Sequence, residues 1–126
     1  MSDTPPIQYA IRLSPRAQRD IAEAVAYFQR TPEADVATAW REGLFRALGT
    51  LATYPERLPL ARDHRRFTQT TRQLIYRRTP NSLAYRVLFH ITELPDEASF
   101  VYVVHIRHGA RGPIKKTEAW EMEAEQ

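Results

Sequence analysis

The start of the chain alternates between apolar and polar or small residues, and this alternation predicts a strand with one buried face. The apolar positions are Ile7, Tyr9, Ile11 and Leu13. Ser14 and Pro15 follow directly. A serine oxygen can accept hydrogen bonds from the free N–H groups of a first helical turn, and proline lacks the N–H that such a turn leaves unpaired. We therefore expect a helix to begin immediately after the strand.

Apolar residues then recur at spacings of three and four, which predicts two amphipathic helices. The first stripe consists of Ala17, Ile21, Ala24, Val25 and Phe28. The second, about five turns long, consists of Val36, Trp40, Leu44, Leu48 and Leu51. Thr31 and Pro32 repeat the helix-start signal between them, and Tyr54 before Pro55 ends the second helix. We expect the two helices to form an antiparallel hairpin, with Trp40 in the core.

Three runs rich in β-branched and aromatic residues follow an irregular connection over residues 55–71 and predict three more strands. The runs span residues 72–78, 83–91 and 99–108. The separators, residues 79–82 and 93–97, contain turn-forming residues and are short enough for hairpins. The predicted fold is therefore α+β: a strand, a two-helix hairpin and a three-stranded antiparallel meander. Two helices would cover one face of the sheet and leave the other at least partly open.

Length and composition predict one small cytoplasmic domain. The chain has 126 residues, of which 43% are hydrophobic and 26% charged, and this suits a single modest core. We expect a core over about residues 7–112 and an acidic tail over residues 113–126. No apolar run could span a bilayer, and residues 1–6 do not resemble a secretory signal. With no cysteine for disulfides or thiolate zinc sites, we expect neither a metal nor another cofactor.

Charge is distributed unevenly along the chain. The net charge is +3, but residues 57–116 contain twelve basic and four acidic residues, a balance of +8. Such a region favours an anionic target, either nucleic acid or an acidic protein, although an ordinary solvated surface would give the same count. Four glutamates follow Thr117. This acidic tail could be a disordered appendage, a short helix or a segment lying on the basic surface, with Trp120 as its anchor.

Arginines on the predicted strands are the first candidates for chemistry. Arg86 lies between apolar neighbours on the less protected face of the sheet, and Arg107 lies near the end of the last strand. Together with Arg72, Arg77 and Arg78, they are expected to form a converging cluster. Guanidinium groups bind phosphate or carboxylate in a bidentate manner, but they cannot act as general bases.

Cleavage of RNA would also require groups that accept and donate protons. His108 is the best candidate, ahead of His90, His105 and Tyr85. For each histidine, an ordinary packed or hydrogen-bonded role is the simpler alternative. His105 and His108 would lie on opposite faces of a strand, which argues against a shared metal ion.

Four segments together carry a family resemblance. They are residues 54–57, 72–77, 85–89 and 104–111, in that order and after a two-helix hairpin. The pattern resembles the RelE/ParE superfamily of type II toxin–antitoxin toxins over about residues 7–112. The resemblance implies a microbial RNase-like fold, a cognate antitoxin that covers the toxin surface, growth inhibition by the free toxin, and plasmid stabilisation by the pair.

The resemblance leaves the target open. ParE-like members poison DNA gyrase and need no acid–base residues, whereas RelE-like members cut mRNA in the ribosomal A site. In a nuclease, the resemblance would assign catalytic roles to Arg77, Arg86, His108 and Arg111. Target or nucleic-acid contacts would fall to Arg72, Arg78 and Arg107. The chain lacks the central-strand lysines of RelE and its tyrosine after Arg111, which favours gyrase. A third alternative is a degenerate toxin fold that only binds its partner.

Overall fold

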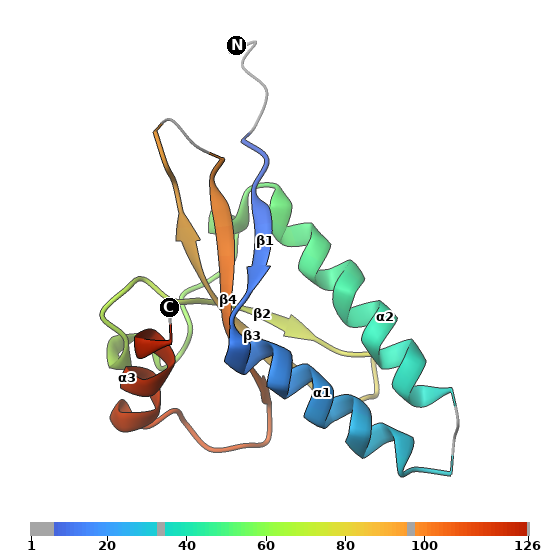
Figure 1. The fold of residues 1–126 in the computed structure, drawn as a ribbon. Coiled ribbons are helices and arrows are strands. Elements are labelled where there is room, and N and C mark those ends of the chain that lie inside the picture. The colour runs from blue at the N-terminus through green and yellow to red at the C-terminus, as the bar shows by residue number, and fades with distance from the viewer. Residues whose placement is uncertain (1–6, 33–34, 96–97, 126) are drawn as a thin grey trace.

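The described part of the chain has the predicted α+β order (Figure 1). The structure is a computed structural model, and it describes residues 7–32, 35–95 and 98–125. Its helices and strands are β1 (Ala10–Leu13), α1 (Pro15–Gln29), α2 (Val36–Gly49), β2 (Arg72–Tyr76), β3 (Tyr85–Thr92), β4 (Phe100–His108) and α3 (Lys116–Ala124). The predicted strands are confirmed to within a few residues. The polar start at residues 1–6 and residues 96–97 of the predicted hairpin turn lie outside the described ranges.

The four strands form one mixed sheet in the order β1-β4-β3-β2. β2, β3 and β4 make the predicted antiparallel meander, in which Tyr85 pairs with Tyr76 on one side and with His108 on the other. β1 lies parallel to β4, with Ala10 opposite Phe100. The pattern of the chain predicted β1 but not this partner. Among the described strands, the first and the last are therefore neighbours in the sheet, although ninety residues separate Ala10 from Phe100 in the sequence.

Where β1 ends, the start of α1 takes over as the partner of β4. The Ser14 backbone N–H donates to the Val103 carbonyl at 2.9 Å, and the Ser14 hydroxyl donates to the Val104 carbonyl at 2.8 Å. Further along α1, the Asp20 carboxylate accepts the Ile106 N–H at 2.9 Å. These bonds satisfy backbone groups at the edge of β4. They also fix α1 relative to the sheet.

Ser14 caps α1 as predicted. Its side-chain oxygen accepts the Ala17 N–H at 2.9 Å, and Pro15 is the first helical residue. The residue that places α1 against β4 is therefore also the residue that starts the helix.

The predicted start of α2 at Thr31 and Pro32 is wrong, because α2 begins at Val36. The Thr31 hydroxyl donates to the Phe28 carbonyl at 2.7 Å, so it satisfies the end of α1 instead. Proline is common shortly after a helix as well as at a helix start. The same local signal thus marked an end where a start was expected. α2 ends at Gly49 and continues as a 3-10 turn over Thr50–Ala52.

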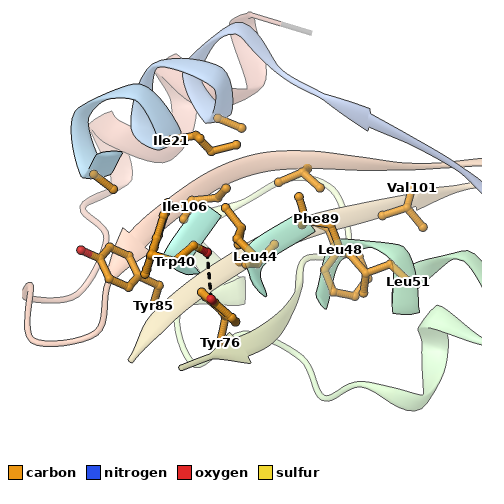
Figure 2. Packing of buried hydrophobic residues seen from close by; sticks show 14 of the residues in the cluster. Ile21, Trp40, Leu44, Leu48, Leu51, Tyr76, Tyr85, Phe89, Val101 and Ile106 are labelled. Carbon is orange, nitrogen blue, oxygen red and sulfur yellow. Dashed lines mark hydrogen bonds between the residues drawn. The ribbon is translucent and has the colours of Figure 1, made fainter. Parts of the chain in front are cut away.

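The main core lies between the sheet and the antiparallel α1–α2 hairpin (Figures 1 and 2). Its labelled members in Figure 2 are Ile21, Trp40, Leu44, Leu48, Leu51, Tyr76, Tyr85, Phe89, Val101 and Ile106. Gly43 on α2 makes room for β2, because a Cβ at this position would collide with the Tyr76 hydroxyl. That hydroxyl donates to the Trp40 carbonyl at 2.8 Å. The predicted core position of Trp40 is confirmed, with 1% of the residue exposed.

The opposite face of the sheet is covered over β3 and β4, whereas Ile75 on β2 is 47% exposed, so this face is partly open as expected. A second apolar cluster lies there, formed by Ala61, Phe67, Leu88, Val104, Ile114, Ala119 and Met122. Its residues come from the connection before β2, from β3 and β4, and from the acidic tail. The tail forms the short helix α3, one of the alternatives left open by the sequence. Trp120, the expected anchor, is 73% exposed, while Ala119 and Met122 are buried.

Glutamates fix α3 to the rest of the domain. The Glu123 carboxylate accepts the Thr68 hydroxyl at 2.6 Å and the backbone N–H groups of Thr68 and Gln69. Burial alone would raise the pKa of Glu123, but these hydrogen bonds bring it below its ordinary value. Glu125 pairs with Arg19 of α1 at 2.9 Å, on the protein surface. The acidic tail therefore lies on the basic part of the domain as an ordered element.

Candidate functional site

Arg86, predicted to lie on the less protected face of the sheet, is buried in an ion pair. Its guanidinium donates to both carboxylate oxygens of Asp63, at 2.6 and 3.2 Å, and to the Gln73 side-chain oxygen at 2.9 and 3.0 Å. Burial alone would raise the pKa of Asp63, but hydrogen bonds from Arg86 and the Ile114 N–H bring it below its ordinary value. Both partners are therefore ionised, and the fold occupies most of the Arg86 donors.

Arg107 is equally buried and holds the segment between β4 and α3. Its guanidinium donates to the Gly112 carbonyl at 2.7 and 3.0 Å, and to the Glu118 carboxylate at 3.1 Å. Burial alone would raise the pKa of Glu118, but hydrogen bonds from the Lys115 N–H and Arg107 lower it below its ordinary value. The positive charge of Arg107 is therefore balanced within the fold.

A basic hollow of about 680 Å³ lies beside this segment. Its charged lining consists of Arg66, Arg107, Arg111, Lys115 and Glu118. The Arg111 side chain is 56% exposed and lies 3.9 Å from Glu118. Sequence reasoning missed Arg66, because it lies in the irregular connection, where the charged run over residues 62–66 is the only local signal. Four cationic side chains, those of Arg66, Arg107, Arg111 and Lys115, therefore border one depression.

His108 and Arg78 lie elsewhere, at a second cavity between the α1–α2 hairpin and the β2–β3 turn. This cavity of about 740 Å³, here called the aromatic pocket, is lined mainly by Tyr27, Phe28, Trp40, Leu83 and Tyr85, with Arg78 and His108 among its polar residues. The His108 ring packs edge-on against Tyr85, with 5.2 Å between the ring centroids. Its Nδ1 accepts the Ala110 N–H at 3.1 Å. Because Nδ1 accepts this bond, Nε2 is the ring nitrogen that carries a proton.

Arg72 and Arg77 lie at opposite ends of β2. Arg72 is half-buried and donates to the Leu58 carbonyl at 2.6 Å. Arg77 is exposed and donates to the Ser82 carbonyl at 2.9 Å. Both guanidinium groups therefore contribute to the local fold, Arg72 by holding the connection and Arg77 by bracing the β2–β3 turn.

The expected single cluster of arginines is not formed. Arg86 and Arg107 are cross-strand neighbours on one face of the sheet, but both are buried in ion pairs. Arg111 borders the basic hollow, and Arg78 and His108 border the aromatic pocket. The strand pattern placed these residues near one another in sequence, but successive residues of a strand point to opposite faces. The catalytic roles assigned by resemblance stay predictions.

The two other candidate histidines, His90 and His105, are both packed inside the fold. His90 is buried, its Nε2 lies 3.0 Å from the Thr71 hydroxyl, and burial lowers its pKa. His105 is fully buried, and its Nδ1 lies 2.6 Å from the Asp20 carboxylate. Within the described ranges, no group of three or more histidine and acidic side chains is placed to hold a metal ion. No helix in those ranges combines the length and the apolar character that crossing a membrane requires.

Comparison with protein families gives a match over most of the chain. The family model described as "ParE toxin of type II toxin-antitoxin system, parDE" matches residues 11–113 of the chain. The match spans the fold from β1 through β4 and ends before α3 begins at Lys116. Comparison with curated proteins finds no match.

Proposed function

Since the chain belongs to the ParE toxin family of type II toxin–antitoxin systems, we propose that it inhibits growth by binding DNA gyrase and not by cutting RNA. Family membership gives it a cognate antitoxin as partner. A toxin with this target acts in the cytoplasm, where we place the protein.

The separation of the candidate catalytic residues carries the choice between the two targets. A nuclease needs a proton acceptor, a proton donor and cations around one phosphate. Here His108 borders the aromatic pocket, while Arg86 is buried and bound to Asp63. Freeing Arg86 for a phosphate would leave the Asp63 charge buried and unpaired, which is strongly destabilising. Binding to a protein target requires only a shaped and charged surface, and exposed arginines such as Arg62, Arg65 and Arg77 supply charge.

The test follows two activities of the purified toxin. With purified gyrase and a relaxed plasmid, we expect less supercoiling or stabilised DNA breaks. With translating ribosomes, we expect mRNA to remain intact. A His108→Ala variant provides the control, because a nuclease that used His108 as an acid or base would lose about 100-fold in rate. Loss of gyrase inhibition on this scale is not expected. Cleaved mRNA with normal supercoiling would overturn the proposal.

The basic hollow supports the alternative, a ribosome-dependent mRNA endoribonuclease. Arg66, Arg111 and Lys115 border it and are exposed, so a phosphate could approach them without disruption of the buried pairs. For this alternative, Arg111→Ala should lower the rate of mRNA cleavage, and inhibition of gyrase should be absent. The same two assays therefore decide between the targets.

A further inference from the structure

The basic hollow is held in shape by the fold around it. Arg107, which lines it and is 3% exposed, donates to the Gly112 carbonyl on the rim at 2.7 Å. The Asp63 carboxylate accepts the Ile114 N–H at 3.0 Å, three residues before Arg66. This bond joins the two chain segments that border the hollow. A site whose walls are already in place loses little freedom when a ligand binds.

The charge of the hollow favours an anionic ligand. Its lining holds four cationic side chains and one carboxylate, that of Glu118. Glu118 already pairs with Arg107 at 3.1 Å. Arg66, Arg111 and Lys115 are exposed, so their donors can bind a phosphate from solvent without breaking the buried pair.

The acidic tail does not cancel this positive charge. Of its four glutamates, Glu118 and Glu123 are hydrogen-bonded to other parts of the domain, and Glu125 pairs with Arg19. The fourth, Glu121, is exposed. Three of the four carboxylates are therefore engaged within the fold, and the hollow stays positive although an acidic helix borders it.

Trp120 lies on α3 close to the hollow and is 73% exposed. Thr117, three residues before it on the same helix, lines the hollow. Side chains three residues apart on a helix are neighbours, with Cβ atoms about 5–6 Å apart, and helical side chains lean towards the N-terminus. We therefore expect the indole beside the rim of the hollow. Because α3 packs through Ala119 and Met122, the fold itself does not need this ring.

An exposed aromatic ring beside a basic depression is the combination by which proteins bind single-stranded nucleic acids. Cations hold the backbone phosphates, and each base offers a flat face that stacks on the ring. In a duplex these faces are covered by stacked neighbours, so the ring favours an unpaired strand. We propose that the basic hollow and Trp120 form a binding site for single-stranded nucleic acid, in which a phosphate lies in the hollow and a neighbouring base stacks on the indole.

This site goes beyond the proposed function, because inhibition of gyrase requires no contact between the toxin and nucleic acid. The family match ends at residue 113 and does not include Trp120, so family membership assigns no role to this ring. DNA bound to gyrase and mRNA on a ribosome share the phosphate and the base that the site recognises. Strands of each kind therefore have to be compared.

Tryptophan fluorescence provides a direct test with the purified full-length toxin. The chain has two tryptophans, and Trp40 is 1% exposed, so acrylamide quenches mainly Trp120. A short thymidine or uridine oligonucleotide should quench the emission and protect Trp120 from acrylamide, since a stacked base covers the ring. The change should be lost in Trp120→Ala. Absence of binding by both strands, or binding that leaves Trp120 open to acrylamide, would overturn the proposal.

Aromatic variants test the stacking. Trp120→Ala should weaken binding of the strand about 10-fold, the scale of one stacked base, whereas Trp120→Phe keeps an aromatic face and should recover most of the affinity. Tyr27→Ala is the control, because it removes an exposed ring that lines the aromatic pocket instead. An abasic strand of equal length keeps the phosphates and should bind the wild type and Trp120→Ala equally. If Trp120→Ala weakens binding of the abasic strand just as much, the ring does not stack and the proposal fails.

Charge variants test the phosphate contact. Arg66→Glu and Arg30→Glu change the net charge equally at exposed positions, but only Arg66 borders the hollow. We expect Arg66→Glu to weaken binding about 10-fold or more and Arg30→Glu less than about 3-fold. Arg66→Gln should also reduce the dependence of log affinity on log salt concentration by about 0.7, the value for one phosphate of a single strand. Circular dichroism and urea unfolding check that the variants fold. Equal losses at both positions would mean diffuse attraction without a site.

The outcomes separate this site from the choice of target. If binding depends on Trp120 and Arg66 but the toxin does not inhibit gyrase, the nucleic-acid site is supported and the gyrase target is wrong. If neither strand binds and the same variants weaken gyrase inhibition, the surface contacts a protein and the present proposal fails. A preference for the thymidine strand would connect the site with gyrase-bound DNA, and a preference for the uridine strand would connect it with mRNA.

Discussion

The core between the sheet and the α1–α2 hairpin consists of aliphatic and aromatic side chains, whereas the face under α3 also buries Arg86, Arg107 and His90. The first face is buried by two helices adjacent in sequence. The second is assembled from a connection, a loop and a short helix, held together by buried ion pairs such as Arg86 with Asp63. We therefore expect the first face to be most sensitive to lost side-chain volume, and the second to be most sensitive to a charge left without its partner.

The largest expected effect comes from removal of one partner of a buried pair. Asp63→Ala leaves Arg86 buried without its carboxylate and removes the acceptor of the Ile114 N–H. We expect the free energy of unfolding, measured with urea, to fall by about 3–5 kcal/mol. The double variant Asp63→Leu, Arg86→Met removes both charges and should recover most of this loss. A double variant as unstable as the single one would show that the loss does not come from the unpaired Arg86 charge.

Cavity-forming substitutions compare the two faces directly. Leu44 on α2 faces the main core and Met122 on α3 faces the second cluster, and both are almost fully buried. We expect Leu44→Ala to cost about 3–5 kcal/mol and Met122→Ala about 2 kcal/mol, because a short surface helix can shift to close the gap. Urea unfolding measures both. Equal costs would mean that the α3 face is as rigid as the main core.

Mild acid should weaken the α3 face. Burial lowers the pKa of His90 below its ordinary value of 6.5, so the unfolded chain binds a proton at pH values where the folded chain does not. The free energy of unfolding therefore falls as the pH drops below 6.5, by at most about 1.4 kcal/mol per pH unit for one proton. Urea unfolding between pH 7.5 and 5.5 measures the slope, and His90→Gln should reduce it. An unchanged slope in that variant would assign the effect to other groups.

The smallest expected effect concerns the surface pair between α1 and α3. The Arg19 side chain is 58% exposed and lies 2.9 Å from Glu125, and exposed pairs of this kind contribute little. Arg19→Ala should change the free energy of unfolding by less than about 0.5 kcal/mol. A loss comparable with that of Met122→Ala would mean that this pair, and not the apolar contacts, keeps α3 in place.

The two faces of the sheet also differ in how well the sequence predicts them. Periodicity identified the hairpin and the strands, because a helix or strand that covers a core repeats its apolar residues locally. It could not identify Asp63 or Glu118 as partners, because each lies in a segment without a repeating pattern and reaches its arginine only through the tertiary fold. A lone arginine on a strand has the same sequence signature whether it binds phosphate or closes a buried pair.

The candidate site shows the same limit. The sequence singled out His108 and Arg78, and the structure places both at the aromatic pocket. It did not single out Leu83 and Tyr27, because scattered exposed apolar residues have no local signature. Only the meeting of the α1–α2 hairpin with the β2–β3 turn reveals them as one site.

The parallel pairing of β1 with β4 also constrains how the protein is made. A ribosome releases β1 first, but its only strand partner among the described elements is β4, ninety residues later in the chain. The helical hairpin emerges meanwhile with its apolar face uncovered by a complete sheet. Long-range contacts of this kind form late in folding. The nascent chain therefore cannot complete its sheet until translation has passed β4, and premature release would leave β1 without its strand partner.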